Sequence, residues 1–345
     1  MSAPIPFHRP SITSAELDAV AAVLRSGWLT TGPKAKELEA AVAAYVAGDG
    51  GDGGAAVQTG EPHAVSLSSC TAALHLALIA AGVQAGDEVV TSPYTFVATG
   101  ETILYLGARP VFVDVEPATK NMDPALLSKA ITPKTRAIVT VSLAGHPCRS
   151  TEIAAVAHGH KIPVIEDAAH SLTARIWDAP VGTQADITCF SFYATKGVTA
   201  GEGGMAVTAH EAWADRIRRL SLHGLSAAAW SRYDKGGWWD YDVTELGYKY
   251  NMTDMQAALA LAQMGRAESM RTRREAIATR YEGALRGIQG LKTPGVPQGM
   301  RHAWHLYQIA VSPKEARLDR SALALALRED GIGTSVHFKP LHLFP

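Results

Sequence analysis

Lys196 follows an apolar, β-rich run of residues and is the first candidate for covalent chemistry in this chain. A lysine that follows a buried strand points into the space beyond the end of that strand. A lysine on an ordinary surface loop is instead surrounded by solvent. A second candidate, Asp167, ends the apolar run VIED, where an unpaired carboxylate is costly. Asp167 therefore needs a cationic partner, which either a nearby arginine or a bound ligand would supply.

A third feature is a possible anion site at Ser69 and Thr71, where a strand gives way to a helix. Free backbone N–H groups and the positive end of the helix dipole favour an anion there, although the same residues also suit an ordinary N-cap. Phe96 follows the next strand along the chain. It is either a core residue or a ring that stacks on a ligand.

Together these residues match what pyridoxal 5'-phosphate (PLP) requires of a protein. The cofactor needs a lysine for its Schiff base, an acid at the pyridine nitrogen, an anion site for its phosphate and a flat contact over the ring. The acid keeps the nitrogen protonated, which makes the ring an electron sink. The sequence has neither a metal-ligand spacing nor the partners of a Ser-His-Asp site. It therefore favours PLP as the cofactor.

The elements that would position these residues alternate between strands and helices. Strands are predicted at 64–67, 88–91, 110–115, 136–142, 162–166 and 187–192. Helices are predicted between them at 71–81, 95–106, 124–130 and 151–158. This alternation predicts an α/β fold whose mostly parallel sheet has helices on both faces. Ligands bind at the carboxyl ends of such strands, which is where the candidate residues stand.

The two ends of the chain add further elements. A capping box of Thr13 and Glu16 predicts an N-terminal helix. Glycine- and aspartate-rich residues 48–62 predict a surface loop. In the C-terminal part we expect one long helix, then a strand, a helix and a strand, over 252–285, 302–311, 318–329 and 334–338. Arg271, Arg273 and Arg274 on the long helix are expected to form a solvated face.

Composition excludes several classes of protein. The 345 residues carry a formal net charge of -1, which gives no reason to expect nucleic acid or an anionic membrane as a partner. No uncharged apolar run is long enough to span a bilayer, and the N-terminus lacks the apolar core of a signal peptide. The cysteines Cys70, Cys148 and Cys189 are too far apart to suggest a disulfide framework. We therefore expect a cytoplasmic protein.

Six motifs, taken in order, resemble the DegT-type (DegT/DnrJ/StrS) sugar aminotransferases, which are fold type I PLP-dependent enzymes. They are SLSSCTAALHLAL, SPYTFVAT, ARPVFVDV, VIEDAAHSL, FSFYATK with GEGG, and LGYKYNMTDMQAALALAQ. The resemblance covers essentially the whole chain. It implies a large PLP-binding domain over 1–245, with an N-terminal arm and a mostly parallel seven-stranded sheet between helices. An inter-domain helix and a smaller α+β domain follow over 246–345.

The resemblance also implies roles around the cofactor ring. Lys196 is similar to the family's Schiff-base lysine, and Asp167 is similar to the partner of the pyridinium nitrogen. Phe96 resembles the ring that covers one face of the pyridine. His170 occupies a position where the family has Gln or His near the cofactor's phenolic oxygen.

For the cofactor's phosphate, the resemblance implies a set of ligands from two subunits. Thr71, the backbone N–H of Ala72 and Ser191 resemble the phosphate ligands of the same chain. Asn251 resembles an asparagine that reaches the phosphate from the neighbouring subunit. The enzyme is therefore expected to be a homodimer with two shared sites.

The reaction that the resemblance implies is a two-stage transamination. L-Glutamate gives its amino group to the cofactor, and a nucleotide-linked keto-sugar (a UDP- or dTDP-4-keto or 3-keto sugar) then receives it and becomes an amino-sugar. Lys196 argues against the branch of the family that has histidine there and dehydrates sugars. Two alternatives remain: amination of a keto-cyclitol or other carbocyclic ketone, and a non-catalytic regulatory relative with the same fold.

The chain departs from the family pattern in a few places. Gly197 stands where the family commonly has asparagine after the lysine, and 98–101 reads ATGE where ATAN is frequent. Both departures bear on substrate fit. Family members usually continue for some tens of residues, so we expect a C-terminal segment to be absent here. Residues 227–241, with three tryptophans, are either a plain connection or a surface that stacks a base or sugar.

Overall fold

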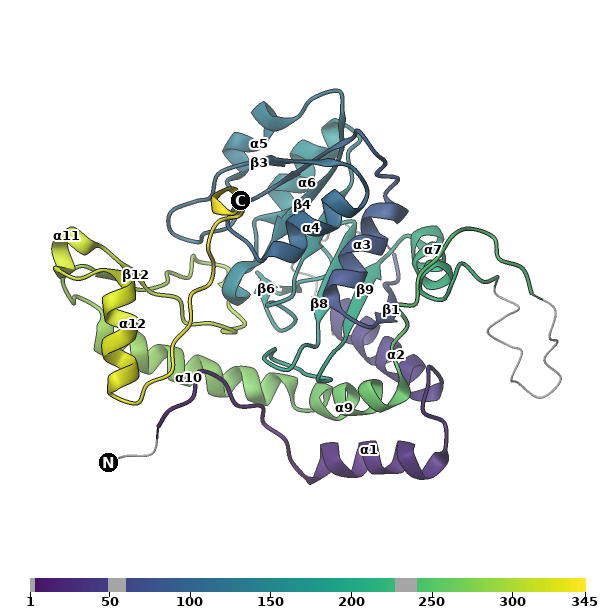
Figure 1. The fold of residues 1–345 in the computed structure, drawn as a ribbon, viewed down its shortest axis with the longest axis horizontal. Helices are drawn as coiled ribbons and strands as arrows, with labels where there is room; N and C mark the ends of the chain where they lie inside the picture. The colour runs from purple at the N-terminus through teal and green to yellow at the C-terminus, as the bar shows by residue number, and fades with distance from the viewer. Residues whose placement is uncertain (1–3, 49–59, 227–240) are drawn as a thin grey trace.

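A seven-stranded sheet forms the centre of the protein, whose computed structural model describes residues 4–48, 60–226 and 241–345 (Figure 1). Its strands are β1 (His63–Leu67), β2 (Glu88–Thr91), β3 (Arg109–Phe112), β4 (Thr135–Val141), β5 (Val164–Asp167), β8 (Ile187–Ser191) and β9 (Gly204–Thr208). They are ordered β1-β9-β8-β5-β4-β2-β3 across the sheet. β8, β5, β4, β2 and β3 are parallel, whereas β9 is antiparallel to both of its neighbours. The predicted mostly parallel sheet is confirmed.

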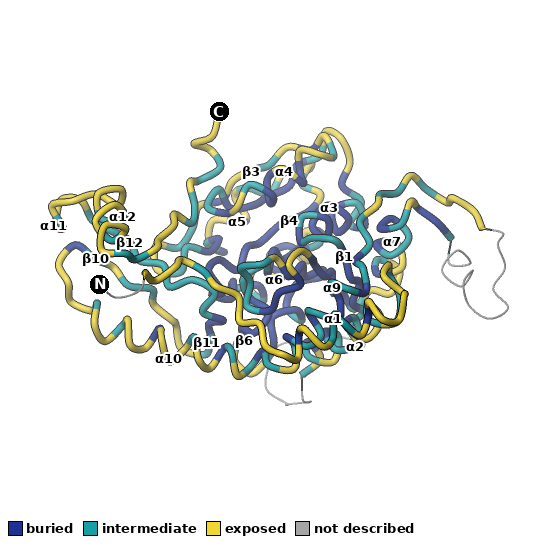
Figure 2. Tube along the Cα trace, turned by 60° about the horizontal axis from the view of Figure 1, so that its bottom comes forward, coloured by how far each residue is buried: buried dark blue, intermediate teal, exposed yellow. Residues whose placement is uncertain are grey.

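Helices cover both faces of this sheet because its central strands, such as β2 and β5, are apolar on both sides. Val89 and Ile165 belong to the same core cluster as α3 and α7, whereas Val90 and Val164 pack with α5 and α6. Successive side chains of a strand point to opposite faces, so a continuous apolar run serves two helical layers. Figure 2 shows the resulting buried interior. The helices around the sheet are α2 (Pro33–Ala47), α3 (Cys70–Ala80), α4 (Val97–Tyr105), α5 (Pro124–Ala130), α6 (Ser150–Gly159) and α7 (Glu211–Ser221).

Gly204 begins β9 at the edge where the parallel strands end. It pairs with Leu67 at the end of β1 and with Ser191 at the end of β8. A Cβ at Gly204 would stand 2.3 Å from the carbonyl carbon of Ser69 and 2.5 Å from the backbone nitrogen of Cys70. Glycine is therefore required for the start of α3 to lie against the start of β9.

The C-terminal part differs from the sequence prediction in three places. The long helix is two helices, α9 (Asp254–Met264) and α10 (Ala267–Leu285), separated at Gly265 and Arg266. The strand expected over 302–311 is reduced to β12 (Ala310–Val311), which pairs with β10 (Leu291–Lys292). No strand forms over 334–338. The carbonyl of His337 there accepts a hydrogen bond from the hydroxyl of Tyr94 (2.8 Å), so side chains take the place of a strand partner.

Of the remaining elements, some match those predicted from the sequence and others were not predicted. α1 (Ser14–Ser26) begins with the predicted capping box, and α12 (Arg320–Glu329) lies within the expected helix. A three-stranded sheet of β6 (Arg175–Ile176), β7 (Ala179–Pro180) and β11 (Met300–Arg301) was not predicted. Residues 49–59 and 227–240, which contain most of the two predicted loops, lie outside the described residues. None of the helices described is both long and apolar enough for a membrane crossing.

We expect Gly204→Ala to lower the free energy of unfolding by about 1–3 kcal/mol, because the added methyl group overpacks the backbone of Ser69. Urea unfolding followed by circular dichroism measures this change. Gly283→Ala in α10 is the matched control, since a Cβ there meets nothing within 4 Å and alanine favours a helix by about 1 kcal/mol. Equal effects of the two substitutions would show that the close approach at Gly204 is unimportant.

Candidate active site

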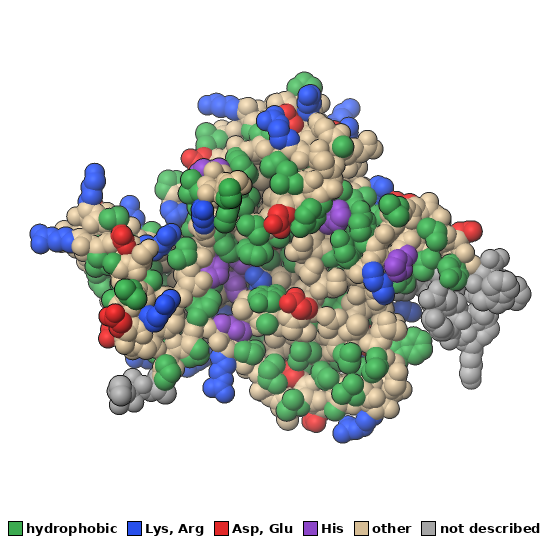
Figure 3. All heavy atoms as spheres, in the orientation of Figure 1, with side chains coloured by type: hydrophobic (Ala, Val, Ile, Leu, Met, Phe, Trp, Pro, Cys, Tyr) green, Lys and Arg blue, Asp and Glu red, His purple; other side chains and the backbone are tan. Residues whose placement is uncertain are grey.

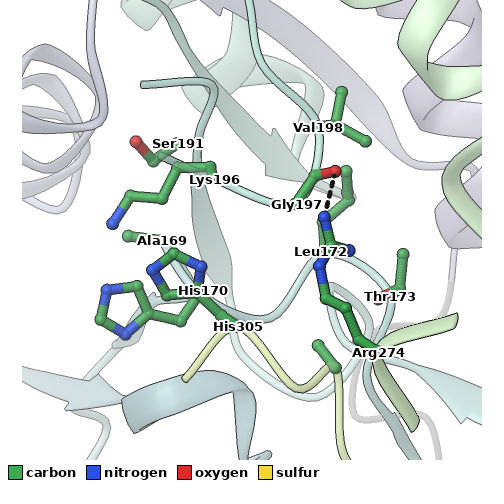
Figure 4. Close-up of a pocket in the computed structure, with 11 residues that line it drawn as sticks. Ala169, His170, Leu172, Thr173, Ser191, Lys196, Gly197, Val198, Arg274 and His305 are labelled. Atoms are coloured by element: carbon green, nitrogen blue, oxygen red, sulfur yellow. Dashed lines mark hydrogen bonds between the residues drawn. The ribbon is translucent and has the colours of Figure 1, made fainter. Parts of the chain in front are cut away.

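Lys196 lies five residues after the end of β8, in a turn. Its backbone N–H donates a hydrogen bond to the carbonyl of Tyr193 (2.9 Å). It lines a small cavity together with Ser191 and His170 (Figure 4). Burial lowers the pKa of its ammonium group from the ordinary 10.5, although Cys70 and Asp167 act in the opposite direction. A buried lysine of lowered pKa more readily becomes the neutral amine that attacks an aldehyde. Lys196 is therefore not a solvated surface lysine.

Asp167 ends β5 and is only 7% exposed. One of its carboxylate oxygens accepts a hydrogen bond from the hydroxyl of Thr99 (2.7 Å), and the other accepts one from the backbone N–H of Ala169 (3.2 Å). Burial raises the pKa of this carboxyl group, and these hydrogen bonds and the charge of Lys196 only partly oppose the effect. Within the described part of the chain, no arginine forms an ion pair with Asp167. The carboxylate thus lacks a close cation, and a protonated pyridine nitrogen fits that position.

The N-terminus of α3 lies beside the end of β8. Cys70 approaches the carbonyl oxygen of Cys189, with its sulfur 3.5 Å away. Gly204 contacts both the start of α3 and Ser191, so these residues share one edge of the sheet. The positive end of the dipole of α3 therefore faces this edge, where it favours an anion such as a phosphate.

The predicted phosphate ligands differ in how far their donors are already engaged. The N–H of Ala72 donates to the hydroxyl of Ser69 (3.0 Å), which is the N-cap of α3. The N–H of Thr71 has no acceptor among the described residues. The Ser191 hydroxyl accepts a hydrogen bond from the N–H of Tyr193 (3.3 Å), which leaves its own O–H able to donate. The phosphate roles of Thr71, Ala72 and Ser191 stay predictions.

Phe96 and His170, the residues predicted to lie beside the cofactor ring, both lie close to the ring of Phe338. Phe96 is 55% exposed, so it is not a core residue, and its ring centre lies 5.7 Å from that of Phe338. The Nδ1 atom of His170 accepts a hydrogen bond from the N–H of Ala144 (3.1 Å). Burial, reinforced by the charge of Lys196, holds the pKa of His170 well below its usual range. The ring is therefore neutral, and its Nε2–H is the side that can donate to a ligand oxygen.

His305 and Arg274 line the same cavity and were missed as site residues in the sequence. The His305 ring lies 4.4 Å from that of His170, and Figure 3 shows histidine side chains gathered in a hollow of the surface. Arg274 donates to the carbonyl of Gly197 (3.0 Å), and a Cβ at Gly197 would stand 3.3 Å from its guanidinium group. The glycine after the lysine therefore makes room for an arginine.

The predicted solvated arginine face on α10 is wrong for two of its three members. Arg271 is buried and forms ion pairs with Glu268 and Glu275 (both 2.9 Å), and Arg274 lines the cavity. Only Arg273 is exposed. The signal was present in the sequence: the buried residues Ala267, Arg271 and Ala278 share one helical face with Arg274.

Asn251 lies beside the end of β1 of the same chain, where it forms an antiparallel β-bridge with Leu67. Its side-chain amide donates to the hydroxyl of Thr31 (2.7 Å) and accepts a hydrogen bond from the ammonium group of Lys249. It is thus at the same edge of the sheet as the start of α3. The predicted reach of Asn251 into a neighbouring subunit stays a prediction.

Asp167→Asn should separate a role in the reaction from a role in folding. The raised pKa of Asp167 means that its ionisation costs stability as pH rises above the unfolded value of about 3.9. At pH 7 we therefore expect the free energy of unfolding of the cofactor-free variant to be within about 1 kcal/mol of the wild-type value, or above it. Transamination should fall by a factor of about 100 or more, because the pyridine nitrogen loses its carboxylate.

Calorimetry of the cofactor-free proteins and a transamination assay measure the two effects. The stability of the wild type should fall relative to that of Asp167→Asn as pH rises above about 4, since the amide does not ionise. A variant that keeps activity but unfolds easily would show that Asp167 is only structural.

Comparison with known proteins identifies the family of this chain. A model of the DegT/DnrJ/EryC1/StrS aminotransferase family matches residues 10–345. The chain is 48% identical over 342 residues to the spore coat polysaccharide biosynthesis protein SpsC of Bacillus subtilis, a match that covers 99% of this chain and 85% of SpsC.

Solved structures give the same result. Spr1654 from Streptococcus pneumoniae, in its PLP form, is 35% identical with a TM-score of 0.87, covering 99% of this chain and 86% of that one. The sugar aminotransferase CalS13 from Micromonospora echinospora is 32% identical with a TM-score of 0.85, covering 99% and 88%. Since the lysine, the acid and the anion site fit PLP, this chain is a PLP-dependent transaminase. It belongs to the DegT/DnrJ/EryC1/StrS aminotransferase family.

Proposed function

We propose that this enzyme transfers the amino group of L-glutamate to a nucleotide-linked keto-sugar and so produces an amino-sugar. The acceptor is a UDP- or dTDP-linked 4-keto or 3-keto sugar. The observation that carries the proposal is the buried Lys196 at the same sheet edge as Asp167, a carboxylate without a close cation. A sugar acceptor is supported by the relatives: CalS13 is a sugar aminotransferase, and SpsC belongs to polysaccharide biosynthesis.

Lys196 and Asp167 have different roles in proton transfer. PLP, when bound, takes up the electron pair that is released at the substrate carbon. Lys196 would hold the cofactor covalently through Nζ. After the amine of the donor displaces it, the free Nζ amine would take the proton from the substrate carbon and deliver it to the former aldehyde carbon of the cofactor. Its lowered pKa increases the neutral fraction of the amine that this step needs. Asp167, held by Thr99 and Ala169, would keep a proton on the pyridine nitrogen.

The other predicted residues would orient the cofactor. Thr71, Ala72 and Ser191 would hold the phosphate at the positive end of the dipole of α3. Phe96 would cover the ring, and the Nε2–H of neutral His170 would donate to the phenolic oxygen. These contacts would leave Lys196 free to move protons without also positioning the ring.

We further propose that the enzyme is a cytoplasmic homodimer in which Asn251 of one subunit reaches the phosphate site of the other. A large domain over 1–245 and a smaller domain over 246–345 would frame each site. The position of Asn251 at the sheet edge where α3 begins supports a role near a phosphate.

The substrate is tested by glutamate-dependent amination across UDP- and dTDP-linked 4-keto and 3-keto sugars and a series of keto-cyclitols. We expect turnover with at least one nucleotide sugar and none with the cyclitols. Lys196→Ala should reduce turnover to background and remove the visible absorbance of the bound cofactor, because no other described amine replaces Nζ in the cavity. Preference for a cyclitol would replace the proposed acceptor, and failure with every ketone would favour a regulatory protein.

Shared sites are tested by mixing two variants, Lys196→Ala and Asn251→Ala, each of which we expect to be nearly inactive by itself. If Asn251 serves the neighbouring subunit, a mixed dimer has one site with both defects and one site with none. Activity should then return to roughly a quarter of the wild-type value after subunit exchange, because about half of the dimers are mixed. If Asn251 serves its own subunit, each site of the mixed dimer has one defect and activity stays absent.

A further inference from the structure

A second cavity, of about 340 Å³, lies between the start of α6, the hairpin of β6 and β7, and β11. It shares no lining residue with the cavity of Lys196. Its volume is in the range of small-molecule sites, which is about 300–1,000 Å³. None of the residues proposed for transamination lines it, so it is not explained by that reaction.

Gln184 lines this cavity and is unusual in being buried without a partner. Only 1% of the residue is exposed, and neither atom of its amide group has a hydrogen-bond partner among the described residues. Burial of an amide without a partner costs roughly 1–3 kcal/mol, so such a group in a cavity wall needs an explanation. A ligand with both donor and acceptor groups would supply what the amide lacks.

Trp177 provides an aromatic surface at the same cavity. It is 61% exposed, although its backbone N–H is held by the carbonyl of Gly299. A Cβ at Gly299 would lie 2.7–2.8 Å from three carbons of the indole ring, which places that glycine over one ring face. The backbone of Gly299 thus packs against one face of the indole, and the exposed rest of the ring is available to a ligand.

The charges at the cavity balance, which disfavours an anion. The guanidinium group of Arg149 is paired with Glu116 (2.8 Å) and with Glu152 (2.6 Å). The N–H of Thr151, in the first turn of α6, has no acceptor among the described residues and adds a donor. Gln298, at the rim, adds a second amide. The set combines an aromatic face, planar amides and neutralised charges.

From this combination we infer that the cavity is a second binding site, for a neutral saccharide. A sugar ring has an apolar face of C–H groups that packs on an indole, and its vicinal hydroxyl groups both donate to and accept from an amide. The inference does not depend on the proposed acceptor, because the site lies outside the residues that carry out the transfer.

The test measures binding of N-acetyl-D-glucosamine, D-glucose and cellobiose to the PLP-loaded enzyme by saturation-transfer NMR and calorimetry. We expect binding of at least one of these sugars, weakened at least tenfold by Trp177→Ala and only partly by Trp177→Phe. Trp28→Ala, at another exposed tryptophan, and Phe96→Ala, at the active site, should leave the affinity unchanged. Transamination by Trp177→Ala should equal that of the wild type.

Gln184→Leu gives a separate readout. Without a partner the amide is a cost to folding, so we expect the leucine variant to unfold at the same or a higher temperature in the absence of sugar while its sugar affinity falls at least tenfold. The inference is overturned if no sugar binds at tens of millimolar, if binding survives Trp177→Ala, or if uridine and thymidine bind there instead. It is also overturned if Gln184→Leu loses stability and no sugar binds, because the cavity then holds structural water only.

Discussion

Two buried groups of opposite charge, each displaced toward its neutral form, underlie the active site. Burial raises the pKa of Asp167 and lowers that of Lys196, and each side chain only partly relieves the other. A direct ion pair between them would remove both effects and would also occupy the place of the cofactor. Thr99 and Ala169 instead hold the carboxylate at the end of β5. The protein thereby keeps an uncompensated acid for a pyridine nitrogen and an amine that loses its proton easily.

The topology of the sheet explains how these groups meet an anion site. β9 runs against its neighbours, so its first residue, Gly204, lies at the edge where β1 and β8 end. The missing side chain lets the start of α3 approach that edge. The dipole of α3 then faces the same region as Lys196, which follows β8. The absence of a side chain at Gly204 thus lets the N-terminus of α3 lie where a phosphate would bind.

Much of the large sheet could be predicted because its strands are short apolar runs separated by helical patterns. The positions of Asp167, Lys196 and Thr71 could be predicted because each lies at the end of a strand or within five residues of it. His305 could not be placed in the same way, since it comes from a part of the chain without a clear pattern. Arg274 shares a helical face with the buried Ala267 and Ala278, but its charge favours the prediction of a solvated face. The strand expected over 334–338 does not form, and the carbonyl of His337 there accepts hydrogen bonds from the side chains of Tyr94 and Gln308 instead. The cavity at Gln184 depends on a hairpin of very short strands that no periodicity reveals.

The central claim is that Lys196, and no other lysine, bonds covalently to the cofactor. Reduction of the PLP-loaded enzyme with borohydride fixes that bond, and mass spectrometry of the digested protein locates it. The account predicts that the pyridoxyl phosphate group is found on the peptide that contains Lys196, in nearly stoichiometric amount. Its presence on a different lysine, or its absence from every peptide of a protein that had bound PLP, would contradict the account.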